Sequence, residues 1–187
     1  MSQMPSPSAE PPYSVLVVED RIHTAFRLRD GVEKSAQLTV CGVAHDLDMA
    51  WSLFERFKPR FVLTDLGLPD GSGVEIIRAV ANADWTCDSM VVSVFGDEHR
   101  AMEALRAGAN GYLLKNTPIN DIGAQILNVI NGGSPMSPQI ARHLLSLVHP
   151  SIDAPEQTNE AFVLTPREQE VCVWWPGAIN ATKLPGS

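Results

Sequence analysis

The chain has 187 residues, of which 44% are hydrophobic and 19% charged, and its formal net charge is −8. This composition supports one globular domain with a real core, plus an appendage. The acidic balance argues against non-specific binding to nucleic acid or to anionic membranes. No apolar run is long enough to cross a bilayer, no signal peptide is visible, and three widely spaced cysteines indicate a reduced cytoplasm.

Apolar segments alternate with amphipathic ones along most of the chain. Residues 1–13 are rich in Pro and Ser and are predicted to be disordered. Periodicity and turn residues then predict five strands and five helices. The strands are predicted at residues 14–18, 38–43, 61–65, 90–95 and 111–115, and the helices at 23–35, 46–57, 73–83, 97–107 and 118–131.

This alternation predicts an α/β fold, a doubly wound five-stranded parallel sheet. The short strands and loops favour the flavodoxin-like order 2-1-3-4-5. The third strand is short and wholly apolar, as expected for a strand that is buried on both faces. In this order the first and third strands are neighbours, so their carboxyl ends meet at one edge of the sheet.

The pattern changes after Gly133. Residues 14–133 form the predicted domain, and residues 134–160 read as a linker that contains a short helix at 139–148. Residues 161–187 contain Thr165 and Pro166, an N-cap followed by proline at the first helical position. Pro176 ends that helix, and too few residues remain for a helix-turn-helix.

Three carboxylates are predicted to meet at one edge of the sheet. Glu19 and Asp20 follow the first strand, and Asp65 ends the third. Carboxylates brought together repel one another, and a hard divalent cation relieves the repulsion. Mg²⁺ suits such a site because it takes oxygen ligands and retains water. We therefore expect Mg²⁺ as the cofactor.

Two further polar residues belong to the same rim. Lys115 ends the fifth strand, and Ser93 lies on the fourth, nearer its middle. Carboxylates with Mg²⁺, a lysine and a hydroxyl form a set that handles phosphoryl groups. Asp65 is the predicted nucleophile, because a carboxylate facing a metal-held phosphoryl group forms an aspartyl phosphate. The simpler alternative is that Asp65 only caps the next turn.

Together, residues 15–20, 64–73, 92–98 and 111–115 resemble the receiver domain of two-component response regulators. The resemblance extends from about residue 14 to residue 133. It is strongest to the NarL/LuxR type, whose linker helix resembles residues 133–141. The opening of that type's DNA-binding domain resembles residues 164–171. The resemblance implies a cytoplasmic phosphoprotein that takes part in phosphorelay signalling.

The resemblance implies a role for each residue of the acidic site. Asp65 would accept a phosphoryl group from a sensor histidine kinase. Asp20 would ligate Mg²⁺ directly, and Glu19 directly or through water. The backbone carbonyl of Gly67 would complete the protein ligands.

It also implies a switch. Lys115 would pair with the carboxylate at rest and with the phosphoryl group afterwards, and Ser93 would hydrogen-bond a phosphoryl oxygen. Tyr112 would be the aromatic switch that turns inward when Ser93 moves. Each role has a simpler alternative: a solvated lysine at the sheet edge, a serine bonded to neighbouring backbone, and a half-buried strand aromatic.

The expected output is transcription regulation in a full-length parent. Phosphorylation would promote a homodimer through the fourth helix, fifth strand and fifth helix, or through the first and fifth helices. The chain would be a phosphoacceptor and not a turnover enzyme. DNA binding is not expected of this chain, because residues 172–187 do not continue the helix-turn-helix pattern. Those residues are native, frame-shifted or a cloning remnant.

Three other functions remain open. One is a non-phosphorylated pseudo-receiver that acts only as an interaction module. Another is a phosphatase of the haloacid-dehalogenase type, which needs a second acid two residues after its nucleophile, where this chain has Gly67. The last is a flavin carrier, which needs a phosphate cradle that the loop after the first strand lacks.

Overall fold

The computed structural model describes residues 11–94 and 98–148. All of them belong to one compact unit. Most of the segment predicted to be disordered and the predicted remnant at 161–187 lie outside these ranges. The domain limits at residues 133 and 160 therefore stay predictions.

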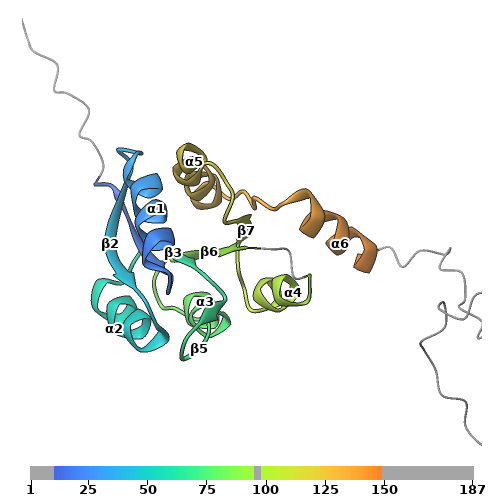
Figure 1. Ribbon diagram of the computed structural model, residues 1–187, viewed down its shortest axis with the longest axis horizontal. Helices are drawn as coiled ribbons and strands as arrows, with labels where there is room; N and C mark the ends of the chain where they lie inside the picture. Colours follow the sequence, from blue (N-terminus) through green and yellow to red (C-terminus); the bar gives the residue numbers. More distant parts are fainter. Residues whose placement is uncertain (1–10, 95–97, 149–187) are drawn as a thin grey trace, which may run out of the picture. The chain divides into compact units, whose positions relative to one another are not determined.

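Five parallel strands form the central sheet, in the order β2-β1-β3-β6-β7 (Figure 1). Counted along the chain, these are the five predicted strands in the order 2-1-3-4-5, so the predicted fold class is confirmed. Their bounds are β1 Tyr13–Val18, β2 Leu38–Ala44, β3 Phe61–Thr64, β6 Asp88–Ser93 and β7 Gly111–Leu114.

The structure corrects several element boundaries of the sequence prediction and adds two short strands. Composition predicts disorder up to residue 13, but Tyr13 begins β1 and donates its backbone N–H to the Gln37 carbonyl at 2.8 Å. Strand β6 begins and ends two residues earlier than predicted. Its first residue, Asp88, tolerates a partly buried position because Arg60 lies 2.5 Å away as an ion-pair partner. A small antiparallel hairpin, β4 (Gly67–Leu68) and β5 (Gly71–Ser72), was not predicted, since two-residue strands show no periodicity.

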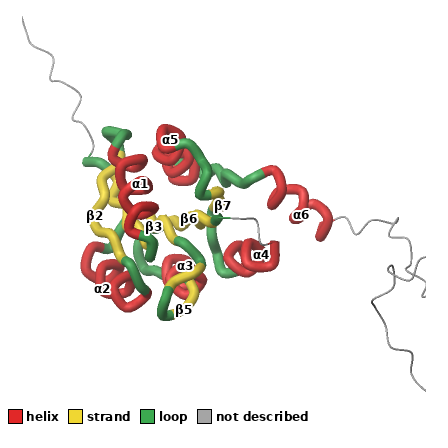
Figure 2. The backbone as a smooth tube through the Cα atoms, in the orientation of Figure 1, coloured by secondary structure: helices red, strands yellow, loops and turns green. Residues whose placement is uncertain are grey.

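Helices cover both faces of the sheet (Figure 2). On one face lie α1 (Ile22–Glu33) and α5 (Ile119–Ile130); on the other lie α2 (Leu47–Phe57), α3 (Val74–Ala81) and α4 (Glu98–Arg106). Gly31 allows α1 and α5 to approach closely, because a Cβ at this position would lie 2.8 Å from Cδ1 of Ile122. Within the described ranges, none of the helices is long and apolar enough to cross a membrane.

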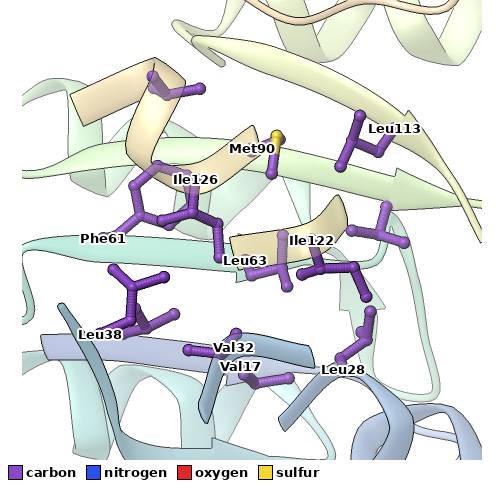
Figure 3. Close-up of a cluster of buried hydrophobic side chains, with 13 residues drawn as sticks. Val17, Leu28, Val32, Leu38, Phe61, Leu63, Met90, Leu113, Ile122 and Ile126 are labelled. Atoms are coloured by element: carbon purple, nitrogen blue, oxygen red, sulfur yellow. The ribbon is translucent and has the colours of Figure 1, made fainter. Parts of the chain in front are cut away.

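Apolar clusters lie on both faces of the sheet, one beneath α1 and α5 and two on the other face. Figure 3 shows the core beneath α1 and α5, where side chains from the strands and the two helices interlock. Fully burying one such aliphatic or aromatic side chain stabilises the fold by about 1.5–3 kcal/mol. These clusters hold the carboxyl ends of β1 and β3 in a fixed relation, and the candidate site lies at those ends.

The chain returns to the sheet after α5. The carbonyl of Pro135 accepts a hydrogen bond from the backbone N–H of Tyr112 at 2.9 Å, and Met136 forms a parallel bridge with the same residue. Helix α6 (Pro138–Val148) follows, one residue earlier than predicted. Its Ile140 is only 1% exposed and packs in one cluster with Tyr112 and residues of α4.

Candidate functional site

Strand register brings the three predicted carboxylates together. Val18 of β1 pairs with Thr64 of β3, so Glu19, Asp20 and Asp65 leave the sheet at the same edge. One carboxylate oxygen from each of the three residues lies within 4.8 Å of those from the other two. Glu19 is fully buried, Asp20 is exposed, and the Asp65 side chain is 13% exposed. The site therefore runs from the interior to solvent.

Lys115 joins two of these carboxylates. Its Nζ lies 2.6 Å from Oε2 of Glu19 and 2.7 Å from Oδ2 of Asp65, and the lysine side chain is 9% exposed. The alternative of a solvated edge lysine is thus wrong. Burial raises the pKa of the Glu19 carboxyl, whereas the hydrogen bond and the charge of Lys115 act in the opposite direction. A buried carboxylate next to a second one needs such a cation.

Backbone contacts fix the direction of Asp65. Its own N–H donates to the Val18 carbonyl at 2.9 Å, and its Oδ1 accepts the Leu66 N–H at 2.8 Å. A Cβ added at Gly73 would overlap the Asp65 carbonyl oxygen. Sequence reasoning placed Gly73 only at the start of a helix and missed this close approach. The glycine-rich turn of residues 70–73 was the available signal.

A second residue that sequence reasoning missed is His45. Its Nδ1 lies 2.9 Å from the Glu19 carbonyl oxygen. A carbonyl can only accept, so Nδ1 carries the proton in this contact. His45 thereby holds the backbone at the start of the acidic pair. A lone histidine after a strand offers no spacing from which this contact could be predicted.

The donor set fits a hard divalent cation. All the clustered side chains offer carboxylate oxygens, the ligands that Mg²⁺ prefers. Lys115 Nζ donates a hydrogen bond to Glu19 Oε1 at 2.9 Å and also lies 2.6 Å from Oε2, so both oxygens of this buried carboxylate contact the lysine. Gly67 lies two residues after Asp65, in β4, and is exposed. The role of its carbonyl as a ligand stays a prediction.

Ser93 and Tyr112 lie on neighbouring strands. Ser93 is the last residue of β6, not nearer its middle as expected, and its carbonyl accepts the Lys115 N–H at 2.6 Å. Tyr112 is completely buried, which excludes the half-buried alternative. In the sheet, Val91 pairs with Tyr112 and Ser93 with Leu114. Since side chains alternate between faces, Ser93 and Tyr112 lie on the same face of the sheet.

Residues 15–127 match the family described as the response regulator receiver domain. This range contains the acidic cluster, Lys115, Ser93 and Tyr112. The chain belongs to this family. The expected resemblance to receivers is thereby confirmed, and so is the type, because the regulators to which the chain is similar include NarL and a LuxR-family member.

Two curated regulators illustrate the relationship. The chain is 28% identical to the transcriptional regulatory protein YdfI of Bacillus subtilis over 130 residues, 70% of this chain and 61% of that protein. It is 26% identical to the nitrate/nitrite response regulator NarL of Escherichia coli over 166 residues, 88% of this chain and 75% of that protein. The alignment therefore leaves out more than a third of YdfI.

Solved structures agree with this receiver fold. A LuxR-family two-component response regulator from Aurantimonas superposes with a TM-score of 0.66 at 25% identity, covering 73% of this chain and 98% of that one. The receiver domain of a NarL regulator from Mycobacterium tuberculosis, at 24% identity, shows the same fold with a TM-score of 0.62. That superposition covers 66% of this chain and 99% of the other.

Proposed function

We propose that this chain is the phosphoacceptor of a two-component pathway. In this proposal Asp65 receives a phosphoryl group from a sensor histidine kinase in an Mg²⁺-dependent step. The observation that carries the proposal is the contact of one lysine ammonium with two carboxylates, at 2.6 Å from Glu19 and 2.7 Å from Asp65. A partly buried Asp beside a movable cation suits a group that gains further negative charge on phosphorylation.

The transfer balances without any other reactant. A carboxylate oxygen of Asp65 attacks phosphorus, a P–O bond forms, and the P–N bond to the kinase imidazole breaks. Mg²⁺ would be held by Asp20, Asp65, the Gly67 carbonyl and Glu19, the last directly or through water. The bound ion would neutralise charge on the phosphoryl oxygens. Lys115 then exchanges Asp65 Oδ2 for a phosphoryl oxygen, and the hydroxyl of Ser93 donates to another.

The proposed output is a change of surface. Movement of Ser93 toward the phosphoryl group alters the packing next to Tyr112, because the two residues share one face of the sheet. The phosphorylated form would dimerise, and a full-length parent would regulate transcription in the cytoplasm. Its relatives YdfI and NarL are described as transcriptional and response regulators, not as enzymes, which supports a phosphoacceptor without turnover.

Intact mass tests the proposal directly. The full chain is incubated with acetyl phosphate and Mg²⁺, next to Asp65→Asn and to a sample with a chelator. We expect one phosphoryl adduct in the wild-type chain and none in either control. Asp70→Asn is a matched carboxylate control, since Asp70 contacts helix α2 and not Lys115; it should still be phosphorylated.

Two outcomes would contradict this function. A folded wild-type chain without an adduct would favour the non-phosphorylated pseudo-receiver. Continuous release of phosphate from a generic phosphate ester would favour the aspartate-nucleophile phosphatase.

A further inference from the structure

Lys115 lies where the chain leaves the sheet. Strand β7 ends at Leu114, and the backbone N–H of Lys115 makes one more ladder bond, to the Ser93 carbonyl at 2.6 Å. The next residues form a turn in which the Thr117 N–H donates to the Leu114 carbonyl at 2.9 Å. The sheet therefore fixes Lys115 on its amino side only.

Arg27 fixes the other side. This half-buried residue of α1 donates from Nη2 to the Lys115 carbonyl and from Nη1 to the Thr117 carbonyl, the latter at 3.2 Å. The guanidinium is a planar fork whose donors have a fixed spacing, so it sets the distance between the two carbonyls as well as their direction. Arg27 is 88 residues from Lys115 and 90 residues from Thr117 in the sequence, so both are long-range contacts.

Helix α1 also follows the acidic pair directly. It begins at Ile22, three residues after Glu19. Arg27 thus joins the segment that carries Glu19 and Asp20 to the loop that carries Lys115. A lysine has a long flexible side chain, and its ammonium reaches two carboxylates at once only if its backbone is held in place.

We propose that Arg27 is a positioning residue that keeps the Lys115 ammonium between Glu19 and Asp65. Without the fork, the backbone after Lys115 is free to shift, and Nζ loses simultaneous contact with the two carboxylates. Two effects follow. Divalent cations then bind more tightly, because the competing ammonium has left the carboxylates. Phosphoryl transfer slows, because Lys115 no longer meets the incoming group; this second effect rests on the proposed function.

The alternative is that Arg27 only attaches α1 to α5. Other contacts already do so. Gly31 packs against Ile122, and Nζ of Lys34 donates to Oδ1 of Asn120 at 2.6 Å. A residue with a merely structural role would loosen the whole site when removed, and it would weaken cation binding as well as phosphorylation. The two readings therefore predict opposite changes in Mg²⁺ affinity.

The test uses the full chain with Arg27→Gln, which removes the charge and the fork, and Arg27→Lys, which keeps the charge and loses the fork. Arg29→Gln is the matched control on the same helix, because Arg29 contacts Asp30 and Glu33 instead of the loop. Calorimetric titration gives the Mg²⁺ affinity, intact mass gives the rate of adduct formation, and a thermal melt reports folding.

We expect Arg27→Gln to bind Mg²⁺ about three- to tenfold more tightly and to be phosphorylated about tenfold more slowly, the range of a coupled pair of contacts. Arg27→Lys should fall between it and the wild type, and Arg29→Gln should match the wild type. In a Lys115→Ala background, Arg27→Gln should change neither quantity further, because the group that it positions is gone.

Weaker or unchanged Mg²⁺ binding in folded Arg27→Gln would overturn the inference, and so would an effect of the same size with and without Lys115. The wild-type chain could form no adduct while Arg27→Gln still tightens Mg²⁺ binding only when Lys115 is present. In that case the proposed function fails and the positioning role stands. The chain could instead be phosphorylated while Arg27→Gln has the same effect on Mg²⁺ affinity with and without Lys115→Ala. In that case the positioning role fails and the function stands.

Discussion

Two aspartates five residues apart show how contacts decide what a carboxylate does. Asp65 meets a lysine ammonium and one backbone N–H at the sheet edge. Asp70 is exposed and accepts the N–H groups of Leu47 at 2.9 and 2.8 Å and of Asp48 at 3.2 Å. Asp70 therefore caps α2 from outside the helix, in addition to the local N-cap Asp46.

The cap gives Asp70 a pH dependence. The Leu47 N–H, followed by that of Asp48, holds the pKa of the Asp70 carboxyl below its usual value of 3.8. The native state then binds fewer protons than the unfolded state, so this stabilisation is complete above the unfolded pKa and is lost as pH falls through the folded one. We expect Asp70→Asn to lower the Tm at pH 7, and the difference from the wild type to shrink below about pH 4.

Melts across this pH range check the prediction. Asp84→Asn, an exposed aspartate in the loop between α3 and β6, should melt like the wild type throughout. If the Tm of Asp70→Asn stayed below that of the wild type by the same amount down to the lowest pH, the charge of Asp70 would not be the source of the stabilisation.

At the scale of elements, α6 is part of the folded unit. Ile140 lies in the cluster with Tyr112 and Ala101, whereas Leu145 of the same helix is 61% exposed. Removing a buried isoleucine side chain leaves a cavity as well as losing burial, so Ile140→Ala should destabilise the protein by about 2–4 kcal/mol. Leu145→Ala should change stability by less than about 0.5 kcal/mol.

Urea unfolding of Ile140→Ala and Leu145→Ala measures the two changes in the free energy of unfolding. Equal, small effects would mean that α6 does not pack on the sheet. If Ile140→Ala changed mainly the slope of the unfolding free energy against urea concentration, the result would point to an uncoupled helix and not to a cavity.

The elements were predictable where their own sequence carries the signal. Short apolar runs and amphipathic helices predicted the strand order, and the ends of β1 and β3 predicted the acidic cluster. The hairpin of β4 and β5, the bridge from Met136 to Tyr112 and the contact of Arg27 with the loop were not predictable. Each depends on a pairing between distant segments, which periodicity within one segment does not encode.

At the scale of the whole molecule, an acidic chain concentrates three carboxylates at one edge and supplies one lysine against them. A cation that binds only the folded state raises stability with its concentration. At a free Mg²⁺ concentration of one hundred times Kd, this stabilisation is about 2.7 kcal/mol. We expect the Tm to rise with added Mg²⁺, and Asp20→Asn to reduce that rise.

Thermal melts with and without Mg²⁺ make the comparison. Asp121→Asn, an exposed acid in the first turn of α5, is the control and should respond like the wild type. A similar rise in Asp20→Asn would place the ion elsewhere on the acidic surface.

The segment that follows α5 has one more consequence. An outer strand normally offers unpaired backbone groups to which a strand of another molecule can attach, the first step of fibrillar aggregation. In β7 the backbone N–H of Tyr112 is already bonded to Pro135, and Met136 lies alongside. At the opposite border of the sheet, the register between β1 and β2 shifts at Val15 and Leu16, an irregularity that hinders such docking. The segment after α5 thus covers part of the outer edge of β7, and we expect it to hinder the addition of a strand from another molecule there.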